Sequence, residues 1–201
     1  MNNLYTRAEI KSKTLGQINC KNTVAKGRDK NNMETKATKV NSLKILLANV
    51  RSLRNKFKEE VLPDILESNY DIVVLTETWI DSRHRDFLAE YGIDSYEVFS
   101  QERISKDKTR GGGIICYFRK SLGAVVLKAV IDNIEGVDKI HIMIKNISGN
   151  KLGIGAYYRP PDTSKESDEL LLEDIQNLTE LNKTDKFETI KLGDFNLTCR
   201  K

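Results

Sequence analysis

Short apolar segments that recur along the chain constrain its fold more than any other feature of the sequence. Each is four to eight residues long, and several are rich in Val and Ile, which is typical of strands buried in a sheet. The segments predicted as strands are 43–50, 72–75, 95–99, 114–118, 124–130, 141–144, 152–158 and 189–192. Because 201 residues can bury one proper core but are few for two, we expect these strands to share one domain.

Two segments between the strands have the spacing of amphipathic helices. In the first, Phe57, Val61 and Ile65 recur at helical spacing, and Pro63 among them predicts a kink or a helix in two pieces. The second spans about residues 164–182. Because helices follow some strands and short turns join others, the predicted fold class is α/β, with packed sheets flanked by helices.

Residues 1–41 differ from the rest of the chain in composition and charge. Up to Val40 they hold nine Lys and Arg residues against three Asp and Glu residues, with scattered apolar residues. We therefore expect a basic, disordered extension over 1–41, followed by one globular domain over 42–201. Such an arm either attracts nucleic acid by counterion release or is simply a solvated extension, and the sequence leaves both interpretations open.

Several features bear on where the protein acts. No apolar run approaches the ~20 residues needed to cross a bilayer, so no membrane partner is expected. Residues 1–22 lack the apolar core of a secretory signal. Three widely separated cysteines, at positions 20, 116 and 199, favour free thiols in a reducing compartment. These features predict an intracellular protein, nuclear or cytoplasmic, and leave its oligomeric state open.

Polar side chains lie at the ends of four predicted strands, where sites built on a rigid scaffold are often found. They are Asn49, Glu77, Tyr158 and the pair Asp194 and Asn196. Carboxylate and amide oxygens suit Mg²⁺, with Mn²⁺ as an alternative, and such an ion can polarise a phosphate. A single residue of this kind more often forms a turn or a cap. Their common position at strand ends nevertheless predicts a site that handles phosphate and metal.

Five short motifs, in order along the chain, resemble those of the endonuclease/exonuclease/phosphatase superfamily. They are Leu47-Ala48-Asn49-Val50-Arg51-Ser52-Leu53, Asp71-Ile72-Val73-Val74-Leu75-Thr76-Glu77-Thr78-Trp79, Arg110-Gly111-Gly112-Gly113-Ile114, Tyr157-Tyr158-Arg159-Pro160-Pro161 and Gly193-Asp194-Phe195-Asn196. The forms Thr-Glu-Thr-Trp and Tyr-Arg-Pro-Pro are similar to those of the apurinic-type endonuclease domains of non-long-terminal-repeat retrotransposons, such as the jockey-like and chicken-repeat groups. The resemblance covers about residues 42–197.

The resemblance implies a two-sheet α/β sandwich that hydrolyses phosphodiester bonds, nicking chromosomal DNA to prime reverse transcription. Carried over by motif, Glu77 is the direct Mg²⁺ ligand and Asn49 lies beside it. Asp194 orients or activates the attacking water. Asn196 helps to hold the phosphate in its transition state, and Tyr158 binds a phosphate oxygen.

One part of the superfamily's pattern is missing from this sequence. The pattern continues with a later aspartate and a Ser-Asp-His motif, so the resemblance implies a domain that lacks its C-terminal strands. His84 and His141 match neither motif, and we expect them to be a surface and a structural residue. Two alternatives therefore stay open: a phosphatase that acts on phosphoesters other than nucleic acid, and an inactive remnant that at most binds nucleic acid.

A glycine run and several cations lie close to the motifs. Gly111-Gly112-Gly113 lacks the helix and lysine of a phosphate-binding loop, so we expect a flexible turn into strand 114–118. The cations are either contacts for the DNA backbone or solvated surface residues. They are Arg51, Arg54, Lys56 and Arg110.

Overall fold

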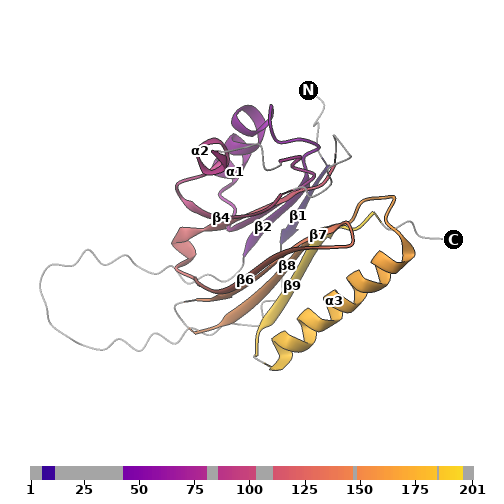
Figure 1. The fold of residues 1–201 in the computed structure, drawn as a ribbon. Coiled ribbons are helices and arrows are strands. Elements are labelled where there is room, and N and C mark those ends of the chain that lie inside the picture. The colour runs from indigo at the N-terminus through magenta and orange to yellow at the C-terminus, as the bar shows by residue number, and fades with distance from the viewer. Residues whose placement is uncertain are drawn as a thin grey trace, which may run out of the picture.

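Two β-sheets pack face to face in the computed structural model, and helices cover both outer faces (Figure 1). The structure describes residues 6–11, 43–80, 86–102, 111–146, 149–184 and 186–196. The two-sheet α/β sandwich expected from the sequence is thereby confirmed.

The first sheet has five strands in the order β1-β2-β3-β5-β4. They are β1 (Thr6–Lys11), β2 (Lys44–Asn49), β3 (Ile72–Thr76), β4 (Tyr96–Gln101) and β5 (Ile114–Arg119). Only β2 and β3 are parallel among these pairs, and Asn49 lies opposite Thr76 at the end of their ladder. Because parallel strands end at the same edge, the residues that follow β2 and β3 are brought together.

The second sheet has four strands in the order β6-β7-β8-β9. They are β6 (Val125–Ile134), β7 (Val137–Lys145), β8 (Lys151–Tyr158) and β9 (Glu188–Asp194). Its only parallel pair in the described chain is β8 and β9, which places Tyr158 opposite Asp194. Each sheet therefore contributes one parallel pair whose ends carry predicted site residues.

Strand β1 lies in the segment that the sequence analysis assigned to a disordered extension. It pairs antiparallel with β2, from Thr6 opposite Asn49 to Lys11 opposite Lys44. An added strand satisfies the N–H and C=O groups along the edge of β2, a gain that composition alone does not reveal. Residues 1–5 and 12–42 lie outside the described residues, and for them the basic extension stays a prediction.

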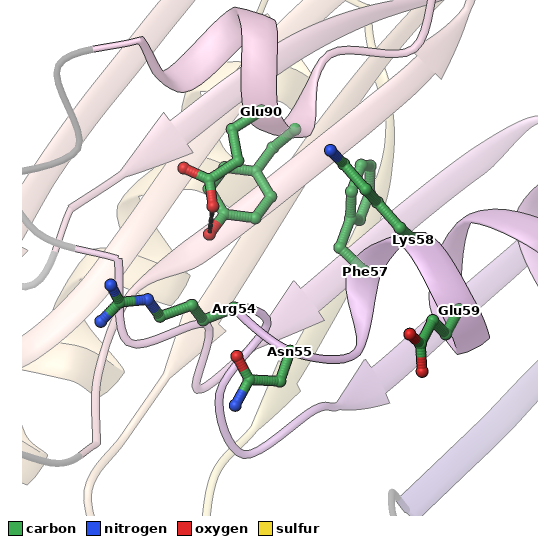
Figure 2. A pocket seen from close by; sticks show the side chains of 7 residues that line it. Arg54, Asn55, Phe57, Lys58, Glu59 and Glu90 are labelled. Atoms are coloured by element: carbon green, nitrogen blue, oxygen red, sulfur yellow. Dashed lines mark hydrogen bonds between the residues drawn. The ribbon is translucent and has the colours of Figure 1, made fainter.

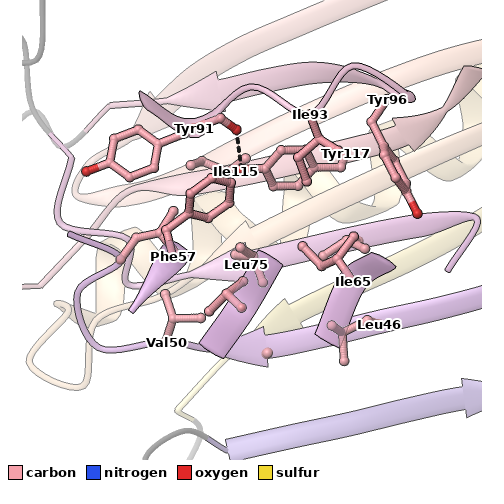
Figure 3. Packing of buried hydrophobic residues seen from close by; sticks show 14 of the residues in the cluster. Leu46, Val50, Phe57, Ile65, Leu75, Tyr91, Ile93, Tyr96, Ile115 and Tyr117 are labelled. Atoms are coloured by element: carbon pink, nitrogen blue, oxygen red, sulfur yellow. Dashed lines mark hydrogen bonds between the residues drawn. The ribbon is translucent and has the colours of Figure 1, made fainter. Parts of the chain in front are cut away.

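One outer face of the first sheet packs against short helices (Figure 3). They are η1 (Phe57–Val61), α1 (Leu62–Ser68) and α2 (Phe87–Tyr91), and a further turn of helix, η2, spans Lys120–Leu122. Leu75 and Tyr117 on the sheet meet Phe57, Ile65 and Tyr91 from the helices. The rings of Phe57 and Tyr91 meet edge to face with centroids 5.4 Å apart. This buried layer packs against the outer face of β2 and β3.

The first predicted helix is in two pieces, as Pro63 suggests. In η1 the hydrogen bonds span five residues, with the N–H of Leu62 donating to the carbonyl of Phe57. Pro63 has no N–H to donate and lies in the first turn of α1, directly after η1, where the hydrogen-bond pattern changes. α1 ends at Asn69, which adopts the left-handed conformation (φ 57°) typical of a helix C-terminus.

The layer between the sheets is built from apolar side chains of both. Ile72 and Val74 of β3 face Ile140 and Ile142 of β7 across it. Cys116 is also buried there as a free thiol, and burial raises its pKa. Cys20 and Cys199 lie outside the described residues. The predicted free thiol is thus confirmed at one of the three positions.

The long helix α3 (Lys165–Thr184) confirms the second predicted helix and covers the outer face of the second sheet (Figure 1). No helix among the described residues is long and apolar enough to cross a membrane. Beneath α3, the carboxylate of Asp174 accepts from Lys139 Nζ at 2.6 Å and lies 3.1 Å from His141 Nε2. His141 Nε2 is also 2.7 Å from the Tyr157 hydroxyl. His141 is therefore a structural residue, as expected from the sequence.

This buried network should make stability depend on pH. Burial by itself would raise the pKa of Asp174, but hydrogen bonds from His141 and Lys139 outweigh it and lower that pKa to about 2. The stabilisation is therefore complete above the ordinary value of 3.8 and is lost as the pH falls through about 2. We expect Asp174→Asn to lower the unfolding free energy at neutral pH by roughly 2 kcal/mol. Urea unfolding at several acidic pH values checks this, and an unchanged pH slope in the variant would contradict it.

Candidate active site

Four of the five predicted site residues meet where the two parallel strand pairs end. Asn49 ends β2 and Glu77 follows β3, whereas Tyr158 and Asp194 end β8 and β9. The Nδ2 atom of Asn49 donates to Glu77 Oε1 at 2.7 Å and to Asp194 Oδ2 at 2.6 Å. A single amide thus joins two carboxylates, one from each sheet. We call these four residues the Asn49 cluster.

The backbone beside the cluster adopts conformations that side chains rarely take. Glu77 and Trp79 have φ values of 52° and 58°, and Arg51 has a φ of 44°. Hydrogen bonds between the two loops hold this geometry: Ser52 N donates to the Glu77 carbonyl at 2.8 Å. Strain of this kind persists only where surrounding contacts impose it, and it is common at active sites.

Tyr158 is the buried phenol of the cluster, with 3% of its surface exposed. Its pKa is raised first by burial, then by the charges of Glu77, Asp194 and Asp138, and also by a hydrogen bond with Glu77. Each of these effects favours the neutral phenol. Tyr158 is therefore a hydrogen-bond donor across the physiological pH range.

Asn196, the fifth predicted residue, forms a side-chain hydrogen bond outside the cluster. Its Nδ2 atom donates to the carbonyl of Arg159 at 2.9 Å, and its backbone is left-handed with a φ of 44°. Arg159 Nη1 donates in return to the Asn196 carbonyl at 3.2 Å. The structure thus ties Asn196 to the Tyr-Arg-Pro-Pro segment, and its direct role on phosphate stays a prediction.

Two buried polar residues next to the cluster were missed by the sequence analysis. Arg159 forms a two-pronged pair with Asp168 of α3, at 2.5 and 3.0 Å. Asp138 of β7 accepts from Gly113 N at 2.7 Å. Arg159 is part of the Tyr-Arg-Pro-Pro motif, but no role was assigned to it. The sequence signal for Asp138 is a charged residue next to the apolar run that forms β7.

Gly111–Gly113, which we call the glycine turn, borders the cluster. All three residues have φ between 80° and 87°, and a side chain on Gly111 would come 3.7 Å from the Tyr158 hydroxyl. The carbonyls of Gly113 and Gly112 accept from Thr78 N and Trp79 N at 3.3 and 3.0 Å. The glycine turn therefore leads into β5, as expected from the sequence, and its hydrogen bonds join it to the segment after Glu77.

We expect Gly113→Ala to be strongly destabilising. A methyl group there would lie 2.4 Å from Thr78 Oγ1, at a φ of +87° that disfavours any side chain. The predicted loss of unfolding free energy is roughly 2–4 kcal/mol. Gly136→Ala is the matched control, because it has a similar φ of +91° but no atom within 4 Å, and should cost about 1 kcal/mol. Equal losses in urea unfolding would contradict the steric argument.

Of the cations near the first motif, Lys56 has a structural contact. Its Nζ atom donates to the Val50 carbonyl at 2.9 Å and so braces the loop after β2. Arg51 and Arg54 are exposed, whereas Arg110 and His84 lie outside the described residues. Arg54 also lines a hollow of about 480 Å³ with the acidic Glu59 and Glu90 and the basic Lys58 (Figure 2). That hollow contains no member of the Asn49 cluster.

Comparison with known proteins identifies the class to which this fold and cluster correspond. The sequence profile described as the Endonuclease/Exonuclease/phosphatase family matches residues 46–201. The chain belongs to this family, whose members hydrolyse phosphoester bonds. No curated protein sequence matches the chain.

Solved structures support the fold at low sequence identity. The human Nocturnin catalytic domain with bound sulfate has 18% identity and a TM-score of 0.55 over 69% of this chain and 55% of its own. A Bacteroides thetaiotaomicron mannosyl-6-phosphatase has 15% identity and a TM-score of 0.50 over 68% and 55%. ANGEL2, a 2′,3′-cyclic phosphatase, has 13% identity and a TM-score of 0.53 over 69% and 43%. The chain spans about half the length of these structures.

Enzymes of this family generally use divalent metal ions, and the residues of the Asn49 cluster fit one. Glu77 and Asp194 converge on one amide, and within the described chain neither forms a salt bridge with Lys or Arg. Carboxylate and amide oxygens are the ligands that Mg²⁺ and Mn²⁺ prefer. The described residues contain no group of three His, Cys, Asp or Glu side chains arranged for a metal. Asn49 presents Nδ2 to both carboxylates and Oδ1 to Arg51 N, so its amide would turn over to place an oxygen beside Glu77 on a cation. Water or phosphate oxygens would complete the coordination.

Proposed function

We propose that the protein is a metal-dependent phosphodiesterase that nicks DNA, as the endonuclease domain of a non-long-terminal-repeat retrotransposon. The observation that carries the proposal is the convergence of Glu77 and Asp194, one from each sheet, on Asn49. The assignment to retrotransposons rests on the forms of the motifs at 76–79 and 158–161. Each segment contains one member of the Asn49 cluster, Glu77 in the first and Tyr158 in the second.

In this proposal each member of the cluster has a separate role. Glu77 and Asn49 would hold a divalent cation, which when bound polarises the phosphate and stabilises the leaving oxygen. Asp194 orients a water and takes up its proton while the water oxygen bonds to phosphorus and the bond to the leaving oxygen breaks. Tyr158 donates its hydroxyl proton in a hydrogen bond to a phosphate oxygen. Asn196 would join Tyr158 on the phosphate once its amide turns away from Arg159.

The surface beside the cluster supports a polyanionic substrate. Arg51 and Arg54 follow Asn49 on one loop and are exposed. The N–H of Arg51 donates to Asn49 Oδ1 at 3.2 Å, so this loop begins at the site itself. In DNA the phosphates that flank the scissile one would lie near such side chains, and binding should weaken with salt.

Nicking of a supercoiled plasmid by the natural protein that carries this chain, with Mg²⁺ and with EDTA, tests the proposal. We expect open-circular product only with the cation. A small phosphomonoester is assayed in parallel. Release of phosphate from it without nicking would replace the proposal by a phosphatase of the same family. Absence of both activities with the cation present would overturn the proposal in favour of a remnant that only binds nucleic acid.

A further inference from the structure

A third carboxylate lies in the same row of the second sheet as two members of the Asn49 cluster. Asp138 of β7 is directly opposite Tyr158 of β8, which in turn is opposite Asp194 of β9. The neighbouring residues Val137 and Tyr157 pack toward α3, on the other face of the sheet. Because side chains alternate along a strand, Asp138 faces the first sheet together with Tyr158.

Asp138 is buried, with 3% of its surface exposed, and its two oxygens accept from different partners. Oδ2 accepts the N–H of Gly113 at 2.7 Å, which links the second sheet to the glycine turn of the first. Oδ1 accepts Asn133 Nδ2 at 2.8 Å, from the adjacent strand β6. The amide of Asn133 is itself oriented, because its Oδ1 atom accepts the N–H of Gly136 at 2.8 Å.

The glycine turn is in turn hydrogen-bonded to the segment that follows Glu77, the proposed metal ligand. Gly113 and Gly112 accept the N–H groups of Thr78 and Trp79 through their carbonyls. Glu77 immediately precedes these residues and is held at a φ of 52°. Such a conformation needs an external restraint, and the glycine turn anchored by Asp138 supplies one.

We propose that Asp138 is a positioning residue of the active site, which fixes the glycine turn and through it holds Glu77 against Tyr158. It touches neither substrate nor metal in this account, and it acts through the backbone of Gly111–Gly113. Its effect on turnover rests on the proposed function, whereas its effect on the segment that contains Trp79 does not. The charge of Asp138 also contributes to the raised pKa of Tyr158.

The chain offers a probe of this segment that is independent of activity, because Trp79 is its only tryptophan. We expect Asp138→Ala to shift the Trp79 emission to the red and to increase acrylamide quenching about twofold, since a locally released segment opens to solvent. Asp138→Asn keeps an oxygen that can accept the Gly113 N–H, so its quenching should stay close to the original. Asp132→Ala is the matched control, as an exposed carboxylate on the neighbouring strand β6.

The second measurement is hydrolysis by the natural protein. Loss of a residue that positions a metal ligand typically costs 10–100-fold, so we expect a kcat loss of about that size in Asp138→Ala with KM little changed. Asp138→Asn should recover most of it. If the original protein has no hydrolytic activity but Trp79 responds as expected, the proposed function fails and the positioning role stands.

Several outcomes would overturn the positioning role. Unchanged Trp79 quenching and kcat in Asp138→Ala would do so, and so would equal effects of the Ala and Asn substitutions. If Asp138→Ala does not fold, Asn133→Ala decides, because it removes one donor to the carboxylate and leaves Asp138 in place. Original quenching in Asn133→Ala would then count against the proposal, and increased quenching would support it.

Discussion

Replacing either carboxylate of the Asn49 cluster by its amide should nearly abolish hydrolysis. For Glu77→Gln and Asp194→Asn in the natural protein, we expect kcat to fall on the order of 10³-fold with Mg²⁺ present. Glutamine and asparagine keep the shape of the side chains but remove the charge that would attract the cation and take up the proton. The double variant should lose little more than either single one, because the groups act as a unit.

These substitutions should leave the fold intact, which separates a catalytic role from a structural one. Each removes one of two carboxylates that converge on Asn49 Nδ2 and leaves the other as its acceptor. We therefore expect the unfolding free energy to change by about 1 kcal/mol or less. Glu59→Gln, an exposed residue outside the cluster, is the control and should keep full activity. A large loss of stability in Glu77→Gln, or hydrolysis that survives it, would count against the account.

A large loss of stability is also expected at Arg159. This side chain is 8% exposed, forms a two-pronged pair with Asp168, and donates to the carbonyls of Pro160 and Asn196. Arg159→Ala would leave Asp168 without its partner, although that carboxylate keeps about 30% exposure. We expect a loss of about 3 kcal/mol in urea unfolding. Arg159→Lys should recover only part of it, because a lysine cannot form the two-pronged pair.

An exposed ion pair on the same helix provides the comparison for Arg159. Lys165 and Glu169 lie 3.7 Å apart, and their side chains are 86% and 68% exposed. Lys165→Ala should change the unfolding free energy by no more than about 0.5 kcal/mol. A loss at Arg159 as small as that at Lys165 would show that the contacts of Arg159 with Asp168 and with the Asn196 carbonyl do not stabilise the fold.

Much of the architecture could be predicted because its strands are strongly apolar. Strands Ile72–Thr76 and Ile114–Arg119 are buried on both faces. They can therefore be recognised as continuous apolar runs, without an alternation of apolar and polar residues. The β6–β7 hairpin is longer than predicted, since charged residues such as Asp132 and Asp138 interrupt its apolar pattern. Its turn at Glu135-Gly136 has positive φ at both residues, a two-residue turn for which glycine is the sequence signal.

The cluster itself was predictable because strand ends are visible in sequence. Asn49, Glu77, Tyr158 and Asp194 each follow or close an apolar run, and two parallel pairs bring those ends together. What could not be predicted depends on contacts across the chain. Asp138 accepts the N–H of Gly113, which precedes β5 of the other sheet. Strand β1 pairs with the edge of β2, although the composition of residues 1–41 does not indicate a strand.

Locating a bound cation tests the central claim most directly. Crystals of the natural protein grown or soaked with Mn²⁺ and measured at the manganese absorption edge would show the ion by its anomalous scattering. The account predicts one strong peak beside Glu77 and Asn49, lost in Glu77→Gln. A peak elsewhere, or no peak at the Asn49 cluster under conditions in which the protein is active, would contradict it.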